Sequence, residues 1–206
     1  PLDGGNLILS DEEKEHFLSI EPLSEKYILP LISAFEFLNG KKRWCIWLVD
    51  IEPNELKQLP EVLKRVELVK QFRLNSVAPS TQKFAMTPTL FRDRNRPETF
   101  IVVPRVSSEN RPYIPFGFFD KNSIVSDTCM SIPLGNKFHF GVLMSTMHMA
   151  WVKTTCGRLK SDFRYSKDIV YNNYPWPENP TEKQVQLIEE KAQNVLDIRA
   201  SFPDSS

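Results

Sequence analysis

Hydrophobic residues recur with helical spacing along residues 138–156, and the rest of the chain is organised around this stretch. One face of the expected helix carries a regular apolar stripe, made by Phe140, Met144, Met147 and Trp151. Further apolar residues lie on the opposite side, so we expect the helix to be buried. Gly157 stands where a left-handed residue would end it. A basic and aromatic loop follows as far as Pro177, which makes the helix a rigid support for a binding surface.

Other stretches also have the pattern of helices. Ser10 and Glu13 are spaced as a capping box, which predicts the start of a first helix. The last expected helix has one apolar and one charged face. The additional helices are expected over residues 10–20, 25–32, 61–74 and 181–200, with a further short piece that starts at Pro53.

The remaining apolar runs are short and rich in aromatic and β-branched residues, which is typical of strands. Residues 43–49 have the character of a central strand. Three later runs, separated by polar turns, predict an antiparallel meander over residues 100–103, 113–119 and 124–132.

These elements predict an α+β fold. A small antiparallel or mixed sheet with recognition loops packs on the long buried helix, with flanking helices and a C-terminal helix around it. We expect three consecutive parts: an N-terminal segment of helices and a strand (1–60), a core domain (61–178), and a C-terminal helix (179–206) that acts as a spacer or packs on the domain.

Charge is unevenly distributed although the formal net charge is zero. Residues 61–168 contain 17 Lys and Arg against 9 Asp and Glu, whereas the two flanks together contain 9 against 17. A basic middle between acidic ends favours a surface that faces a polyanion. Chance clustering of surface charges gives the same pattern, so charge alone leaves nucleic-acid binding open.

The cysteine content and the hydropathy pattern bear on the compartment. Cys45, Cys129 and Cys156 are few and odd in number, which indicates free thiols in a reducing compartment. There is no N-terminal apolar signal and no apolar run near the ~20 residues of a membrane span. We therefore expect a soluble cytoplasmic protein with no membrane partner. Because the chain begins at Pro1 and not at Met, we interpret it as a piece of a longer polypeptide.

The sequence lacks the motifs that would make this chain an enzyme by itself. It has no glycine loop that could hold a dinucleotide or S-adenosylmethionine. The Asx-Pro-Pro-aromatic motif of amino-group DNA methyltransferases is also absent, and residues 172–177 have similar residues in another order, typical of a rigid aromatic turn. We expect no catalytic residue and no cofactor in this chain.

Two sets of side chains have the chemistry of metal ligands: Asp50, Glu55 and Lys57, and His139, His148 and Cys156. The first set could hold a metal beside a phosphate, but acids at a strand end and a helix start are expected as caps. The two histidines of the second set are nine residues apart on one helix and so point to opposite sides. We expect no metal site.

Arginine and amide side chains in the loops are the strongest functional signal. Arginine matches guanine, asparagine matches adenine and glutamate accepts from cytosine, while lysine can serve phosphates. The candidate DNA contacts are Arg92, Arg94, Asn95, Arg96, Arg105, Ser107, Ser108, Glu109, Arg111, Lys153, Arg158, Lys160, Arg164, Tyr165 and Lys167. An ordinary solvated surface is the alternative explanation for each of them.

Several long stretches follow one another in a distinctive order: PLDGGNLILS, NGKKRWCIWLVD, VKQFRLNS, RVSSENRPYIPFGF, HFGVLMSTMHMAWVKTTCGRLKSDFRYSKDIVYNNYPWP and SFPDSS. In this order they closely resemble the target-recognition region of MmeI-like type II restriction-modification enzymes and of related N6-adenine DNA methyltransferases. The likeness covers nearly the whole chain.

The resemblance implies a parent polypeptide with an adenine-specific methyltransferase domain that uses S-adenosylmethionine, often joined to a nuclease that needs Mg²⁺. This piece, no enzyme alone, would read an asymmetric site in double-stranded DNA for the methyltransferase domain. In that family base-reading side chains lie in variable loops, here residues 91–97 and 126–130 with 107–111 between them. The alternative is a protein–protein docking or scaffold domain of the same complex without direct base contacts.

Overall fold

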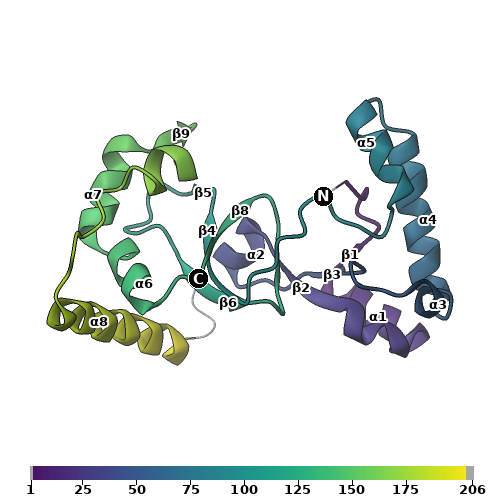
Figure 1. Ribbon diagram of the computed structural model, residues 1–206, viewed down its shortest axis with the longest axis horizontal. Coiled ribbons are helices and arrows are strands. Elements are labelled where there is room, and N and C mark those ends of the chain that lie inside the picture. Colours follow the sequence, from purple (N-terminus) through teal and green to yellow (C-terminus); the bar gives the residue numbers. More distant parts are fainter. Residues whose placement is uncertain (1, 203–206) are drawn as a thin grey trace. The chain divides into compact units, whose positions relative to one another are not determined.

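The computed structural model describes residues 2–202, and its elements are labelled in Figure 1. Pro1 and residues 203–206, parts of the expected terminal segments, lie outside the described residues. The chain forms two compact units: Pro1–Ile32, Lys42–Arg96 and Asn122–Ile124 make the first, and Ser33–Lys41, Pro97–Lys121 and Val125–Ser206 the second. Residues 33–41 lie in the second unit, whereas residues 61–96 and 122–124 lie in the first.

The first unit is built on a small sheet with β3 near its centre. The strand order is β1 (Ile8–Leu9), β3 (Trp44–Ile46), β2 (Ile28–Ile32) and β7 (Ile124–Val125). Both β1 and β2 pair with β3 in antiparallel orientation. The helices of this unit are α1 (Asp11–Ile20), η1 (Pro22–Tyr27), α3 (Pro53–Leu56), α4 (Pro60–Leu74), α5 (Pro79–Lys83) and η2 (Phe84–Met86).

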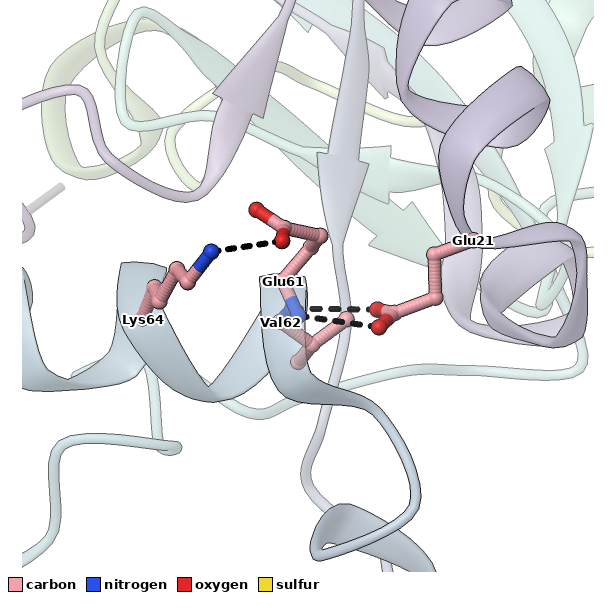
Figure 2. A network of polar contacts seen from close by, with 4 residues as sticks. All are labelled: Glu21, Glu61, Val62 and Lys64. Carbon is pink, nitrogen blue, oxygen red and sulfur yellow. Dashed lines mark hydrogen bonds and ion pairs between the residues drawn. The ribbon is translucent and has the colours of Figure 1, made fainter.

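The start of α4 is capped by a carboxylate from a distant part of the sequence. The two oxygens of Glu21, which follows α1, accept hydrogen bonds from the backbone N–H groups of Glu61 (2.9 Å) and Val62 (3.0 Å) (Figure 2). Helix N-termini leave such N–H groups without intrahelical partners and favour negative charge. Glu21 therefore fixes α4 to α1 through the polar end of the helix.

Local signals predicted α1 but not the segment after it. The capping box of Ser10 and Glu13 is present, as expected. The helix expected over 25–32 was wrong, because this stretch splits into η1 and the strand β2. Pro30 cannot donate within a helix, whereas in β2 the neighbouring Leu31 N–H donates to the Arg43 carbonyl at 2.8 Å.

Each unit has its own hydrophobic core. The first core lies between the sheet and α4, and its buried residues include Leu7, Leu9, Ile28, Cys45, Ile46, Trp47, Val62, Val66, Val69 and Phe91. The second core is formed by Ile101, Val103, Ile114, Phe116, Phe140, Leu143, Met149, Val152, Phe163, Tyr165, Val170 and Ala192.

The second unit contains two three-stranded sheets. In one, β4 (Thr99–Pro104) lies between β6 (Gly117–Asp120) and β8 (Cys129–Pro133), and both pairs are antiparallel. The expected meander was wrong, because it would place the second strand in the centre, and because β7 belongs to the four-stranded sheet of the first unit. In the other sheet, β10 (Asp162–Arg164) lies between β5 (Val106–Ser107) and β9 (Gly157–Leu159).

The expected long helix over 138–156 is in fact two helices, α6 (Lys137–Leu143) and α7 (Thr146–Thr155). Ser145 separates them by capping α7, since its Oγ accepts from the His148 N–H at 3.1 Å. The expected cap at Gly157 was also wrong: α7 ends at Cys156 in extended conformation, and Gly157 opens β9.

Three further helices complete the second unit: α2 (Ala34–Asn39), the π-helix η3 (Lys167–Tyr171) and α8 (Glu182–Ser201). The last helix begins where expected, with Thr181 as its N-cap, and packs on α6. A Cβ at Gly141 of α6 would lie 2.6 Å from Ile188 Cγ2 and 3.1 Å from the Ile188 carbonyl oxygen. Glycine is therefore needed for the close approach of these two helices (Figure 1).

Candidate nucleic-acid interface

The candidate DNA contacts are divided between the two units. Arg92, Arg94, Asn95 and Arg96 belong to the first unit, and the remaining candidates, from Arg105 to Lys167, belong to the second. Each unit thus presents a group of its own, one on a segment without regular structure and one around a hairpin.

The hairpin of β9 and β10 has a two-residue turn, because Asp162 pairs with Leu159 across it. The first turn residue, Lys160, is exposed and has a φ of 56°, the left-handed region that a side chain with a Cβ rarely adopts. Strained backbone conformations of this kind are often found at functional sites. The geometry presents a cation at the tip of a rigid turn.

Alternation along β10 separates a buried face from an exposed one. Phe163 is buried, whereas its neighbour Arg164 is exposed. Arg158, the cross-strand partner of Phe163, places its guanidinium 4.0 Å from the centroid of the Phe163 ring and donates from Nη1 to the Ser161 carbonyl at 2.8 Å. The core therefore holds Arg158 on one side of the hairpin and directs Arg164 to the other.

The SSENR stretch, residues 107–111, lies beside this hairpin because β5 pairs with β10. The Glu109 N–H donates to the Asp162 carboxylate at 3.4 Å, which links the turn after β5 to the hairpin. The sheet thus brings together five candidates from two stretches that are far apart in sequence. We call this group the hairpin cluster: Ser108, Glu109, Arg158, Lys160 and Arg164.

Two of the expected contact residues are part of the core, which corrects the prediction for them. Tyr165 is 1% exposed, its hydroxyl lies 3.0 Å from His148 Nε2, and its ring meets that of Phe116 edge-on. Burial raises the pKa of the Tyr165 hydroxyl. Ser107 is 2% exposed and pairs with Phe163 on the inward side. An aromatic residue among basic residues suggests an exposed position. Only the alternation of buried and exposed residues along a strand predicts that it is buried.

Arg105 and Arg111 make contacts that hold other segments of the second unit. Arg105 is exposed, and its Nε donates to the Asp127 carbonyl at 2.8 Å. Arg111 is half-buried, and its Nη2 donates to the Leu38 carbonyl at the end of α2. Of the expected loop over 126–130, the last two residues belong to β8, and Thr128 Oγ1 accepts from the Ala34 N–H at 2.9 Å.

Lys153 and Lys167 are exposed cations on two other elements of the second unit. Lys153 lies in the last turn of α7. Lys167 opens η3, and its Nζ lies 3.5 Å from Asp168 Oδ1. Exposed ion pairs contribute little to stability, so these lysines are available for a role at the surface.

The first unit presents residues 92–96, which we call the arginine segment. Arg92, Arg94 and Asn95 are exposed, Arg96 is half-buried, and no helix or strand includes them. Immediately before the segment, the Phe91 ring stacks on Trp47 with centroids 5.3 Å apart and an angle of 10°. The segment therefore leaves the core from a fixed point.

Asp162 was not among the predicted residues, although it takes part in the cluster. Its carboxylate accepts from Glu109, and it shares the outward side of β10 with Arg164. Its part in the cluster depends on the pairing of β5 with β10, which brings Glu109 beside it. The alternation in the stretch from Asp162 to Tyr165 is the signal that could have shown it.

The structure also bears on the metal sets considered from the sequence. Glu55 forms an ion pair with Lys26, and His139 caps α6 together with Asn136. His148 is buried, and this burial lowers its pKa to about 4. Among residues 2–202, no group of three or more His, Cys, Asp and Glu side chains could hold a metal ion. Within the same range, no helix has the length and apolarity to cross a membrane.

The chain has clear relatives. A sequence model of the family described as "MmeI, target recognition domain" matches residues 1–178. DNA methyltransferase A of Bacillus subtilis (strain 168) is 39% identical over 200 residues, which cover 97% of this chain and 23% of that protein. A solved structure, described as the Type IIL restriction-modification enzyme MmeI in complex with DNA, is similar with a TM-score of 0.95 and 42% identity, over 100% of this chain and 28% of that one.

This chain spans about a quarter of the length of both relatives. The α+β architecture predicted from the sequence is confirmed by the match to the solved structure, and the resemblance noted in the sequence is confirmed by the family match. The chain belongs to the MmeI target recognition domain family.

Proposed function

We propose that this domain reads a specific base sequence in double-stranded DNA. The observation that carries the proposal is the hairpin cluster, in which one sheet gathers cations and hydrogen-bonding side chains from two parts of the chain. Support comes from the similarity of the whole of this chain to part of an enzyme whose solved structure is described as a complex with DNA. The arginine segment of the first unit supplies a second group of forked donors.

The chemistry of the two groups suits both kinds of contact that a DNA reader makes. Arginine presents a planar fork that can bond both acceptors of a guanine edge, and glutamate can accept from cytosine. Lysine is a compact charge that suits phosphate oxygens, which position the protein without reading sequence. We propose base contacts for exposed members such as Arg94 and Arg164. We propose phosphate contacts for Lys153 and Lys167, which lie on two other elements of the second unit.

We further propose that the parent polypeptide is an adenine-specific DNA methyltransferase and that its methyltransferase domain is the partner of this domain. The names of the two relatives, a DNA methyltransferase and a restriction-modification enzyme, support this. S-adenosylmethionine would be held by that other domain, and Mg²⁺ would be needed only if the parent also carries a nuclease. No part of this chain is proposed to catalyse a step.

The test begins with the recognised site. Sequencing of methylated adenines in a host that carries the full gene should reveal one asymmetric sequence. Fluorescence anisotropy with the full-length protein should then show binding to that sequence at least ~10³-fold tighter than to random duplex, with an affinity that falls steeply as salt rises. Equal affinity for both duplexes at every salt concentration would contradict the proposal.

Single substitutions should then locate the reading surface. Arg164→Ala and Arg94→Ala should each weaken specific binding by about 5-fold to 100-fold, because each removes a forked donor. Lys183→Ala, an exposed cation in the first turn of α8, is the matched control and should change affinity less than about twofold. Methylation at near-cognate sites should rise in a variant that loses a base contact.

A docking domain is the second candidate, and one feature of the first unit favours it. Several large apolar side chains on or near α4, α5 and η2 are exposed: Leu68, Phe72, Leu74, Val77 (99%) and Met86 (84%). Exposed apolar residues of this kind suit contact with another protein domain. If docking is the only role, Arg94→Ala and Arg164→Ala leave DNA affinity unchanged, whereas Val77→Asp and Met86→Asp lower the stability of the full-length protein.

A further inference from the structure

We propose that the buried side chain of Arg73 is a positioning residue for the arginine segment. This inference rests on the proposed function, since it assigns Arg73 a role in holding residues that read DNA. Arg73 lies in the last turn of α4 and is 1% exposed, so it cannot itself reach a duplex. Its effect has to pass through the backbone that it binds.

The Arg73 guanidinium binds backbone carbonyls from two other parts of the first unit. Nε donates to the Leu2 carbonyl at 2.6 Å. Nη1 donates to the carbonyls of Phe84 (2.9 Å) and Thr87 (2.8 Å), and Nη2 donates to that of Leu90 (2.8 Å). Four of the five N–H groups of an arginine are thereby used. We call this arrangement the Arg73 clasp.

The clasp needs arginine rather than any cation. Burial lowers the pKa of Arg73, opposed by the nearby Asp3 carboxylate, and a guanidinium nevertheless stays charged in proteins. Its planar fork directs donors at several fixed carbonyls at once, whereas lysine carries three donors on one atom. Lysine at this position could therefore not hold residues 84–90 and Leu2 in the same arrangement.

The clasp ends directly before the arginine segment. Leu90 is the last residue held by Arg73, and the next residue, Phe91, stacks on Trp47 of the first core. Arg92 follows at once, so two consecutive anchors set where the segment leaves the core. Within residues 84–90, the Leu90 N–H also donates to Thr87 O and the Thr87 N–H to Phe84 O. Residues 84–91 thus form a fixed base from which Arg92, Arg94 and Asn95 project.

The test is a double-mutant cycle in the full-length protein, with DNA affinity for the recognised site as the readout. Arg94→Ala should weaken specific binding about tenfold in the unsubstituted protein. In an Arg73→Lys background, where the segment is already displaced, the same substitution should cost less than about threefold. The slope of log affinity against log salt should also become shallower in Arg73→Lys if phosphate contacts of the segment are lost.

Arg164→Ala in the second unit is the control that distinguishes local displacement of the arginine segment from a general loss of stability. It should weaken binding by the same factor in the unsubstituted protein and in the Arg73→Lys background, because the Arg73 clasp contains no residue of the hairpin cluster. Phe91→Leu is the second variant: it removes the stack on Trp47, leaves the clasp in place and should couple to Arg94→Ala in the same way, even if Arg73→Lys fails to fold.

Equal effects of Arg94→Ala in all backgrounds would overturn the inference, since Arg73 would then act on stability alone. No effect of Arg94→Ala in a protein that still binds its site specifically would overturn it as well. Absence of any specific binding by the unsubstituted protein is a different result, because it refutes the proposed function itself.

Discussion

The hairpin cluster and the arginine segment present similar side chains on different supports. The hairpin rests on an apolar support, in which Phe163 and Tyr165 are buried in the core of the second unit. The arginine segment has no regular structure and begins where a polar support ends, the carbonyls bound by Arg73. Charged side chains can therefore be held at a surface either by burying their strand neighbours or by tying down the backbone before them.

The two supports differ in how they fail. An apolar support loses packing when a side chain is shortened, and the loss spreads through the cavity that remains. A polar support loses hydrogen bonds to specific atoms, and the carbonyls left unpaired carry a desolvation penalty at those places. Substitutions in the hairpin support should therefore affect the second unit broadly, whereas those at the clasp should act on residues 84–96.

The largest expected effect is that of Phe163→Ala. The ring is buried and lies under Arg158, so its removal should lower the free energy of unfolding of the second unit by ~3–5 kcal/mol. Native-state hydrogen exchange of the full-length protein should show faster exchange throughout β9, β10 and β5. The amides of Thr87 and Leu90 in the first unit should keep their protection.

Arg164→Ala is the control for this substitution, because Arg164 is adjacent in β10 but exposed. It should change the free energy of unfolding by no more than ~0.5 kcal/mol while weakening DNA binding. A comparable loss of protection in both variants would show that the buried and exposed residues of β10 do not have separate roles in stability and in DNA binding.

Acidification should weaken the apolar support through His148. Burial holds the pKa of this imidazole at about 4, below its ordinary 6.5, and its ring lies among Phe116, Tyr165 and Tyr174. The unfolded chain therefore binds a proton that the folded chain does not between these values. The free energy of unfolding therefore has its full value with respect to His148 above pH 6.5. It decreases as the pH falls toward 4, by at most ~3 kcal/mol.

The measurement is the pH dependence of hydrogen exchange in the second unit, corrected for intrinsic exchange rates. His148→Gln should flatten it between pH 6.5 and 4, and His16→Gln, on the exposed face of α1, should leave it unchanged. The first unit should not share this dependence on His148, because its core contains no part of the His148 environment.

Much of the fold could be predicted because it depends on local signals. The Ser10 and Thr181 caps, the helix over residues 60–74 and the strand β3 all follow from neighbouring residues. One error was local: Ser145 caps α7 and so divides the apolar stripe that predicted one long helix. The order of the strands depends instead on partners far away in sequence, since β4 pairs on both sides with strands that follow it.

The candidate site was predictable in its residue types but not in its supports. The sequence indicated Arg158, Lys160 and Arg164 as contacts, and the structure places all three on exposed positions of one hairpin. Tyr165 was assigned to the surface because aromatic residues in basic loops often contact bases. The Arg73 clasp could not be predicted, because the sequence around an arginine in an amphipathic helix does not indicate which backbone carbonyls it will bind.

A small effect on stability is expected for Lys160→Gly, and this substitution separates strain from function at the hairpin tip. Glycine adopts the φ of 56° without the penalty that lysine carries, so the substitution should stabilise the hairpin or leave it unchanged, by up to ~1 kcal/mol. If the strained lysine is kept to contact DNA, affinity should fall several-fold although the fold is no less stable.

Leu134→Gly, at another exposed residue with a φ of 57°, should relieve similar strain and leave DNA affinity unchanged. Equal affinity for Lys160→Gly and the unsubstituted protein would mean that the turn tolerates its strain for the shape of the hairpin alone, and the contacts would then have to come from Arg164 and its neighbours on the outward side of β10.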